Sequence, residues 1–324
     1  MKFYDRINEI KTLQEIEKRS KNNAQMTVVM GRRRVGKTEL LKHSFISIPV
    51  LYFFVEKKTE MLLCEEFVQE IQSSLGINVF GEYKKFKVLF AYLMELSKTR
   101  NFTLIIDEFQ EFGKINPSVF SEMQNVWDSN KNDSKMNLVI CGSIYSMMKR
   151  IFENSKEPLF GRVTAKLYIK PFTNSVIKQI LSDKNKKYTA EDLLAFYTVS
   201  GGVAKYAEQL IDNNAVTKKK IFNYIFSEGS FFLNEGRDVL IEEFGKDYGV
   251  YFSILSLIAS SKTARGEIES ILGFEIGGYL DRLENEYQII SRKKRKGFRE
   301  GRKYSGLFFA NLAKYFAFFV VKKV

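Results

Sequence analysis

The sequence is poor in the residues that bind transition metals or form disulfides. Its 324 residues include two cysteines, Cys64 and Cys141, and one histidine, His43. The cysteines lie far apart without a CxxC pair, so the chain has too few soft ligands for a zinc site. We expect both thiols to be buried and reduced.

The chain also lacks the apolar segments that direct export or cross a membrane. Its first six residues, Met-Lys-Phe-Tyr-Asp-Arg, carry charge where a secretory signal has its apolar region. The most membrane-like stretch, residues 307–321, is shorter than the roughly 20 residues of a spanning helix and contains Lys314. We therefore expect a cytoplasmic protein without a membrane segment.

The sequence does contain 45% hydrophobic residues, enough for two or three folded domains. Residues 1–171 alternate helical periodicity with short β-branched apolar runs, a pattern typical of a parallel sheet covered by helices. We therefore predict the α/β fold class for residues 1–171. The expected strands are residues 26–30, 50–55, 103–106, 137–140 and 166–169, with helices such as residues 62–75 and 88–98 between them.

The second half of the chain has a different pattern. Residues 172–244 contain only helical stretches and predict a helical lid subdomain. Residues 245–306 predict a winged helix, with helices at 248–259, 265–272 and 278–286 and short strands at 288–291 and near Lys303 and Tyr304. Residues 307–324 form an apolar tail, either a terminal helix or the truncated remnant of a further domain.

A strict phosphate-binding motif, GxxxxGK[ST], follows the first predicted strand and opens a helix. Its glycines let backbone amides surround phosphate oxygens, and the start of the helix adds positive charge. We predict that Lys37 reaches the β- and γ-phosphates and that Thr38 binds Mg²⁺. The nucleotide-binding residues are expected to be Gly31, Arg32, Arg33, Arg34, Val35, Gly36, Lys37, Thr38 and Glu39.

Two adjacent acids, Asp107 and Glu108, follow the apolar strand at residues 103–106. We predict that Asp107 holds Mg²⁺ and that Glu108 polarises the attacking water as general base, the step that separates hydrolysis from binding. Ser143 follows the next strand, where it either contacts the γ-phosphate, orients the attacking water, or simply belongs to a Gly-Ser turn. Asn137, at the start of that strand, is the weaker candidate for such a sensor.

These motifs together resemble the archaeal-type ATPase family of the AAA+/STAND P-loop NTPases. The similarity covers residues 1–300 and begins with Arg6 and Glu9 in the opening F-x-x-R-x-x-E pattern. It continues through the arginine-rich P-loop, Asp-Glu-Phe-Gln at 107–110, Cys-Gly-Ser at 141–143, Pro-Leu-Phe-Gly-Arg at 158–162 and Ser-Gly-Gly-Val-Ala at 200–204.

The resemblance implies ATP rather than GTP, and a sheet in the order 5-1-4-3-2 with an extra strand at residues 50–55. It also implies that Arg162 approaches the γ-phosphate, in the same chain or from a neighbouring subunit; the alternative is an ordinary surface arginine. This chain departs from the family pattern at Ala204, where a proline is usual. It also ends at Val324, where relatives often continue into a nuclease-like domain, so no nuclease activity is expected.

We expect an Mg-dependent ATPase that acts as a conformational switch, or alternatively a winged-helix adaptor that binds nucleotide with little turnover. The macromolecular partner is open: nucleic acid, a protein, or a second copy of the chain. Residues 292–303, from Arg292 to Lys303, carry eight basic residues and one acid, and suit phosphates beside a groove. The preceding helix carries three acids, which disfavours base reading, and a protein contact or a solvated basic face stays open.

If this basic segment binds DNA, log K should fall steeply with log salt, by a slope of roughly 0.9 per phosphate contact. Neutralising the five basic residues at 292–296 should remove most of that slope. Fluorescence anisotropy with a labelled duplex across a salt series measures it. Salt-independent binding, or no binding at low salt, would contradict the DNA hypothesis.

Overall fold

Five parallel strands form one sheet in the computed structural model, which describes residues 1–45, 48–287, 289–293 and 307–310. Their order is β2-β3-β4-β1-β5, which reads 5-1-4-3-2 from the opposite edge. The predicted parallel α/β sheet is confirmed, each strand within two residues of its expected bounds. The strands are β1 (Gln25–Met30), β2 (Val50–Phe54), β3 (Thr103–Asp107), β4 (Asn137–Gly142) and β5 (Ala165–Tyr168).

Burial along the strands explains why they read as apolar runs. Every residue of β1, β3 and β4 is buried, because helices cover both faces of the sheet at its centre. The edge strands β2 and β5 alternate between buried and more exposed residues. Since all five strands are parallel, the loops that follow β1, β3 and β4 emerge at the same edge of the sheet.

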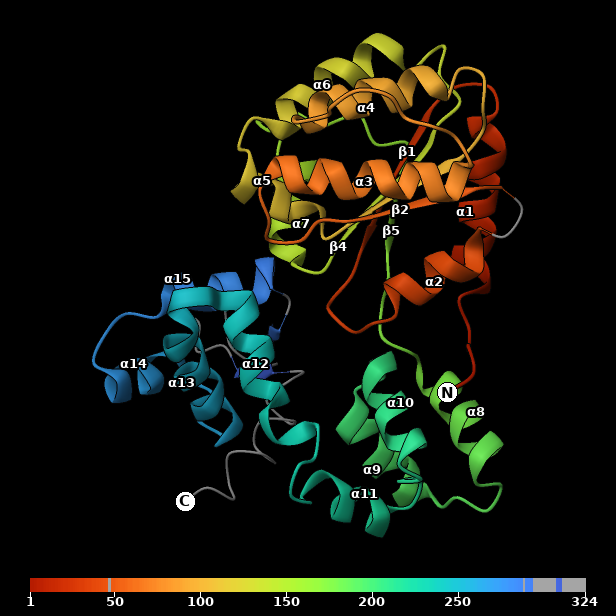
Figure 1. The fold of residues 1–324 in the computed structure, drawn as a ribbon. Coiled ribbons are helices and arrows are strands. Elements are labelled where there is room, and N and C mark those ends of the chain that lie inside the picture. The colour runs from red at the N-terminus through yellow and green to blue at the C-terminus, as the bar shows by residue number, and fades with distance from the viewer. Residues whose placement is uncertain (46–47, 288, 294–306, 311–324) are drawn as a thin grey trace. The chain divides into compact units, whose positions relative to one another are not determined.

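Two apolar layers hold helices against the sheet (Figure 1). One layer joins the side chains of α3, α4, α6 and α7 to one face, and the other joins α1 and α2 to the opposite face. The helices of this unit, Phe3–Lys170, are α1 (Ile7–Ser20), α2 (Lys37–Ser44), α3 (Glu60–Leu75), α4 (Phe86–Leu96), η1 (Phe109–Glu111), α5 (Phe112–Ile115), α6 (Val119–Asn130) and α7 (Tyr145–Glu153).

A second unit comprises Met1–Lys2 and Pro171–Val324 and begins with helices. A capping box between Thr189 and Asp192 starts one of them, and Gly201 ends it. Gly202 lies so close to Phe172 that a Cβ atom there would be 2.3 Å from the Phe172 carbonyl oxygen. The helices are α8 (Asn174–Lys184), α9 (Ala190–Ser200), α10 (Ala204–Asp212), α11 (Lys218–Ile225) and α12 (Phe232–Phe244).

Ala204, where the family pattern has proline, is the first residue of α10. Proline is favoured at a first helical position because its missing N–H would have no helical partner there. Alanine is a strong helix former and starts the same helix here. The departure from the family pattern therefore leaves the start of α10 in place.

The final part of the described chain has its own apolar core, formed by side chains from residues 244–290. It contains η2 (Gly245–Asp247), α13 (Tyr248–Ala259), α14 (Arg265–Leu272), α15 (Gly277–Asp281) and the π-helical turn η3 (Arg282–Glu286), followed by β6 (Ile290–Lys293). The helices expected at 248–259 and 265–272 have the predicted bounds. The helix expected at 278–286 instead divides into α15 and η3.

The strand that pairs with β6 is β7 (Leu307–Ala310), in antiparallel register. We expected it near Lys303 and Tyr304, which lie outside the described residues. The prediction placed residues 307–310 in the apolar tail; in the structure they form this strand, which the aromatic side chains of Phe308 and Phe309 favour. Among the described residues, no helix combines the length and apolar content needed to cross a bilayer.

Helix α1 carries one buried acid. Glu17 is 9% exposed, and its Oε1 atom has no hydrogen-bond partner among the described residues. Burial raises the pKa of this carboxyl above its ordinary value of 4.5, against the lowering effects of Lys21, Thr103 and Lys18. The folded state therefore retains a proton over a pH range in which the unfolded chain has lost it.

Because the folded pKa is raised, Glu17 loses its contribution to stability as the pH rises from 4.5 through the folded value. Glu17→Gln removes this titration. Relative to wild type, its free energy of unfolding should increase between pH 4 and pH 7, as measured by urea denaturation. Glu15→Gln, on the exposed side of α1, is the control; equal pH dependence in the Glu17 variant and wild type would refute the expectation.

Candidate nucleotide-binding site

The P-loop, residues 31–36, connects the end of β1 to the start of α2. A Cβ atom at Gly31 would lie 2.8 Å from the carbonyl oxygen of Ile169, so this position requires glycine. Lys37 is only 7% exposed, and its Nζ atom donates to the carbonyl oxygens of Gly31 at 2.8 Å and Arg32 at 3.1 Å. The positive charge of Lys37 is therefore held inside the loop, at the place predicted for the phosphates.

Arg6, from the opening motif, ties the P-loop to the end of the sheet. Its side chain is buried, and its Nη2 atom donates to the carbonyl oxygens of Lys170 at 2.6 Å and Val35 at 3.4 Å. An ion pair with Glu9 at 3.3 Å compensates its charge. These contacts give the arginine a structural role in holding the loop.

The Asp107 carboxylate ends β3 and is 5% exposed. Its Oδ2 atom accepts hydrogen bonds from the hydroxyls of Thr38 at 3.3 Å and Tyr52 at 2.5 Å. Its Oδ1 atom accepts from the Cys141 thiol and the Glu108 backbone N–H, both at 2.9 Å. Four donors therefore surround the acid predicted to hold Mg²⁺.

Tyr52 and Cys141 are held in their protonated, donating forms. Burial raises the pKa of the Tyr52 phenol, and the nearby Asp107 carboxylate raises it further. Burial likewise raises the pKa of the Cys141 thiol well above its ordinary value, again with a contribution from Asp107. Both groups therefore donate hydrogen bonds to Asp107 at neutral pH.

Glu108, the predicted general base, has a left-handed backbone with a φ of +54°. Its Oε2 atom accepts a hydrogen bond from the Ser143 hydroxyl at 2.7 Å and another from Gln110 Nε2. Gly142 makes room for Gln110, since a Cβ atom at Gly142 would lie 2.2 Å from its Oε1 atom. The carboxylate is thus oriented by two side-chain donors.

The structure brings together Gly31, Lys37, Thr38, Asp107, Glu108 and Ser143 at the carboxyl edge of the sheet. Within the motif, Val35 is buried, Arg32 and Arg34 are half-buried and Arg33 is exposed. Glu39 is exposed and forms an ion pair with Lys42 at 3.0 Å. Asn137 lies at the other end of β4, where its Nδ2 atom donates to Thr103 at 3.0 Å.

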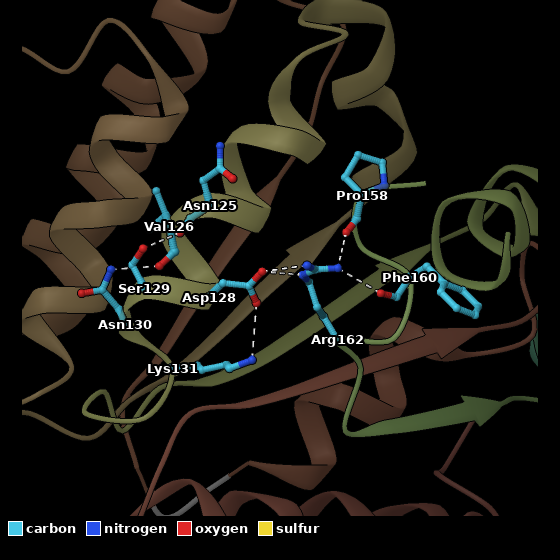
Figure 2. Close-up of polar contacts among 9 residues, drawn as sticks. All are labelled: Asn125, Val126, Asp128, Ser129, Asn130, Lys131, Pro158, Phe160 and Arg162. Atoms are coloured by element: carbon cyan, nitrogen blue, oxygen red, sulfur yellow. Dashed lines mark hydrogen bonds and ion pairs between the residues drawn. The ribbon is translucent and has the colours of Figure 1, made fainter. Parts of the chain in front are cut away.

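Arg162 is not part of this group. Figure 2 shows its guanidinium bonded to Asp128 on α6, with Nε at 2.9 Å and Nη2 at 2.7 Å from Oδ2. Its Nη1 atom donates to the carbonyl oxygens of Pro158 at 2.7 Å and Phe160 at 3.1 Å. Partial burial acts to raise the pKa of Asp128, but the contacts with Arg162 lower it below the ordinary value.

The place of Arg162 follows from the topology. It precedes β5, whereas the P-loop follows the neighbouring strand β1. Parallel neighbours begin at one edge and end at the other, so Arg162 lies at the amino edge, opposite the P-loop. The expected approach to the γ-phosphate of its own chain is therefore not realised in this structure.

A parallel 5-1-4-3-2 sheet with a P-loop after its first strand and two acids after its third is the fold of a P-loop NTPase. Residues 3–210 match the model of a family described as "ATPase domain predominantly from Archaea". The chain belongs to this family of archaeal-type ATPases. The family expectation from the sequence motifs is confirmed.

Among curated proteins, the chain is 29% identical over 298 residues to an uncharacterized protein of Methanocaldococcus jannaschii. That match covers 90% of this chain, which spans 62% of the relative's length. The Walker-type ATPase PABY2304 of Pyrococcus abyssi has a similar fold, with a TM-score of 0.68, 17% identity and coverage of 97% and 95% of the two chains. The Aeropyrum pernix ORC2 protein, solved as ADPNP-ADP complexes, also has a similar fold. Its TM-score is 0.59 at 13% identity, and the match covers 98% of this chain and 94% of that protein.

Sequence reasoning missed three side chains that bond to the site acids. Cys141 was expected only to be buried and reduced, and its hydrogen bond to Asp107 was not foreseen. Tyr52 lies in an apolar strand, where a tyrosine reads as part of the core. Gln110 follows Glu108 by two residues and was noted only within the family motif. The left-handed backbone at Glu108 and the absence of a side chain at Gly142 bring Gln110 to the carboxylate, and no local sequence pattern encodes that combination.

Arg162→Ala should lower the free energy of unfolding by about 1 kcal/mol, because it removes partly exposed charge-assisted bonds between α6 and residues 158–160. Asp128→Ala tests the same ion pair, and the double variant should cost less than the sum. Nucleotide affinity of the isolated chain should not change. A weakened nucleotide Kd with unchanged stability would contradict this structural assignment.

Proposed function

We propose that this chain binds ATP with Mg²⁺ and hydrolyses it to drive a conformational switch. The observation that carries the proposal is a continuous hydrogen-bonded series beside the P-loop, from Thr38 through Asp107 and Glu108 to Ser143. This series connects Thr38 and Asp107, whose oxygen atoms suit Mg²⁺, to the Glu108 carboxylate, which can accept a proton. Membership of an ATPase family supports the same reaction.

The residues present fit a magnesium nucleotide. The Thr38 hydroxyl and the Asp107 carboxylate supply the oxygen ligands that Mg²⁺ prefers, 3.3 Å apart. When bound, Mg²⁺ would supply positive charge that offsets the negative charge developing on the phosphates during hydrolysis. Thr38 and Asp107 are the residues proposed to hold it, and Gly31 through Glu39 provide the nucleotide loop.

The remaining polar groups have distinct proposed roles. Lys37 places a positive charge inside the loop, where it stabilises the β- and γ-phosphates. Glu108 orients the attacking water and accepts its proton. Ser143 donates to Glu108 and so fixes the direction of that carboxylate, or turns to the γ-phosphate when nucleotide is present.

Arg162 remains a proposed catalytic residue only for the site of a neighbouring subunit. Its Nη2 atom lies 2.7 Å from Asp128 Oδ2 in an ion pair. This ion pair would have to open before Arg162 could reach the γ-phosphate bound by another chain. Such a role makes the active form a homo-oligomer.

For the second half of the chain we propose a helical lid over residues 172–244 and a winged helix over residues 245–306, with 307–310 now joined to it. Support comes from the common core of α13, α14 and α15 and from the antiparallel pairing of β6 with β7. The basic segment from Arg292 to Lys303 makes nucleic acid a proposed partner, and a protein partner is the alternative.

A second candidate is a nucleotide-dependent adaptor with little turnover. It is favoured by the two hydrogen bonds that Ser143 and Gln110 already make to Glu108 Oε2. A carboxylate engaged in this way is less available to a water molecule. Slow hydrolysis would follow until a partner rearranges these donors.

Glu108→Gln separates the two candidates. It should lower phosphate release by at least about a hundredfold, because the general base is lost, while ATP affinity stays within about twofold. Lys37→Ala should weaken nucleotide binding itself. Glu65→Gln, an exposed position on α3, is the control for an equivalent change of charge.

The measurement is phosphate release with and without duplex DNA, together with the Kd for a fluorescent ATP analogue. Release by wild type that is lost in the Glu108 variant supports the ATPase. If wild type binds ATP but releases no phosphate under either condition, the adaptor is correct. Failure to bind ATP would overturn both proposals.

A further inference from the structure

Tyr52 is a contact of the site that no phosphate or metal motif includes. It lies on β2, the edge strand beside β3, and the apolar layer beneath α1 and α2 packs against its ring. Its hydroxyl donates to Asp107 Oδ2 at 2.5 Å. The Thr38 hydroxyl donates to that same oxygen atom at 3.3 Å.

The four donors to Asp107 differ in strength. Cys141 offers a thiol, which is a weak donor, and the Glu108 N–H belongs to the adjacent residue. The Thr38 contact is long for a bond between a hydroxyl and a carboxylate. The phenol of Tyr52 makes the shortest contact, and packing of its ring fixes where the hydroxyl lies.

The bond from Tyr52 matters because Thr38 donates to the same oxygen atom, Asp107 Oδ2. A carboxylate rotating about its terminal torsion meets only a broad, shallow preference, so neighbouring donors must select one orientation. The bond from Tyr52 fixes the plane of the carboxylate so that the oxygen it accepts through, Oδ2, also faces the Thr38 hydroxyl. A carboxylate oxygen has two lone-pair sites, so Oδ2 can accept both hydroxyls at once.

We propose that Tyr52 is a positioning residue for the divalent cation: its phenol holds Asp107 in the orientation that pairs the carboxylate with the Thr38 hydroxyl. This inference rests on the proposed Mg²⁺-dependent nucleotide site. In this role Tyr52 acts through its hydrogen bond to Asp107.

Tyr52→Phe tests the inference, because it deletes the hydroxyl and keeps the packed ring. Tyr168→Phe is the matched control. Tyr168 lies on β5, the other edge strand, and its phenol also donates to a carboxylate, that of Glu153. The measurement is the Kd of a fluorescent ATP analogue, first in EDTA and then across a Mg²⁺ titration. Binding alone is measured, so the result does not depend on turnover.

In EDTA the three proteins should bind the analogue within about twofold of one another, which also establishes that the variants are folded. Tyr52→Phe should need about tenfold more Mg²⁺ for half of its effect on the Kd, the loss expected for one hydrogen bond to a charged group. Tyr168→Phe should behave as wild type. A matching tenfold shift in Mn²⁺ would support positioning of the ligand pair.

Two results overturn the inference while leaving the proposed function intact. If Tyr52→Phe needs the same Mg²⁺ as wild type, the phenol only fills space beside Asp107. If it needs less Mg²⁺, the phenol competes with the ion for Oδ2. If the affinity of wild type itself does not respond to Mg²⁺, the proposed magnesium site fails, and the role of Tyr52 fails with it.

Discussion

The parallel pairing of β1, β3 and β4 determines where every polar group of the site lies. Gly31 and Ser143 are separated by more than a hundred residues, yet both follow strands that end at one edge of the sheet. The same constraint carries Arg162 to the opposite edge, because it precedes its strand. Position relative to a strand end, more than distance in sequence, decides which residues meet.

Burial of Asp107 is the second constraint, and it follows from the first. A carboxylate removed from water is costly unless hydrogen bonds replace its hydration. The compensation comes from Thr38, Tyr52, Cys141 and the Glu108 N–H, which belong to four different parts of the core. The motifs supply two of these partners, and the extra strand and the end of β4 supply the others. The surrounding sheet therefore contributes chemistry as well as support.

Much of the fold could be predicted from the sequence because its signals are local. Buried strands read as apolar runs, and the P-loop needs glycine, lysine and threonine at fixed spacing. Tyr52 could not be found this way, because its role depends on a neighbouring strand and not on its own surroundings in sequence. The edge on which Arg162 lies likewise depends on strand direction. The pairing strand was expected near Lys303 and found at β7, because the basic residues between the two strands give the sequence no fixed spacing from which to place the second strand.

The close approach of Gln110 to Gly142 restricts which substitutions this part of the site can accept. Any larger residue at 142 would collide with Gln110 Oε1 and also with Met148, whose Sδ atom lies 2.6 Å from the site of a Cβ. A side chain at 142 therefore requires the flexible side chains of Gln110 and Met148 to move aside. Shortening Gln110 would remove its bond to Glu108. A substitution at 142 would displace Gln110 and so change how firmly Glu108 is held.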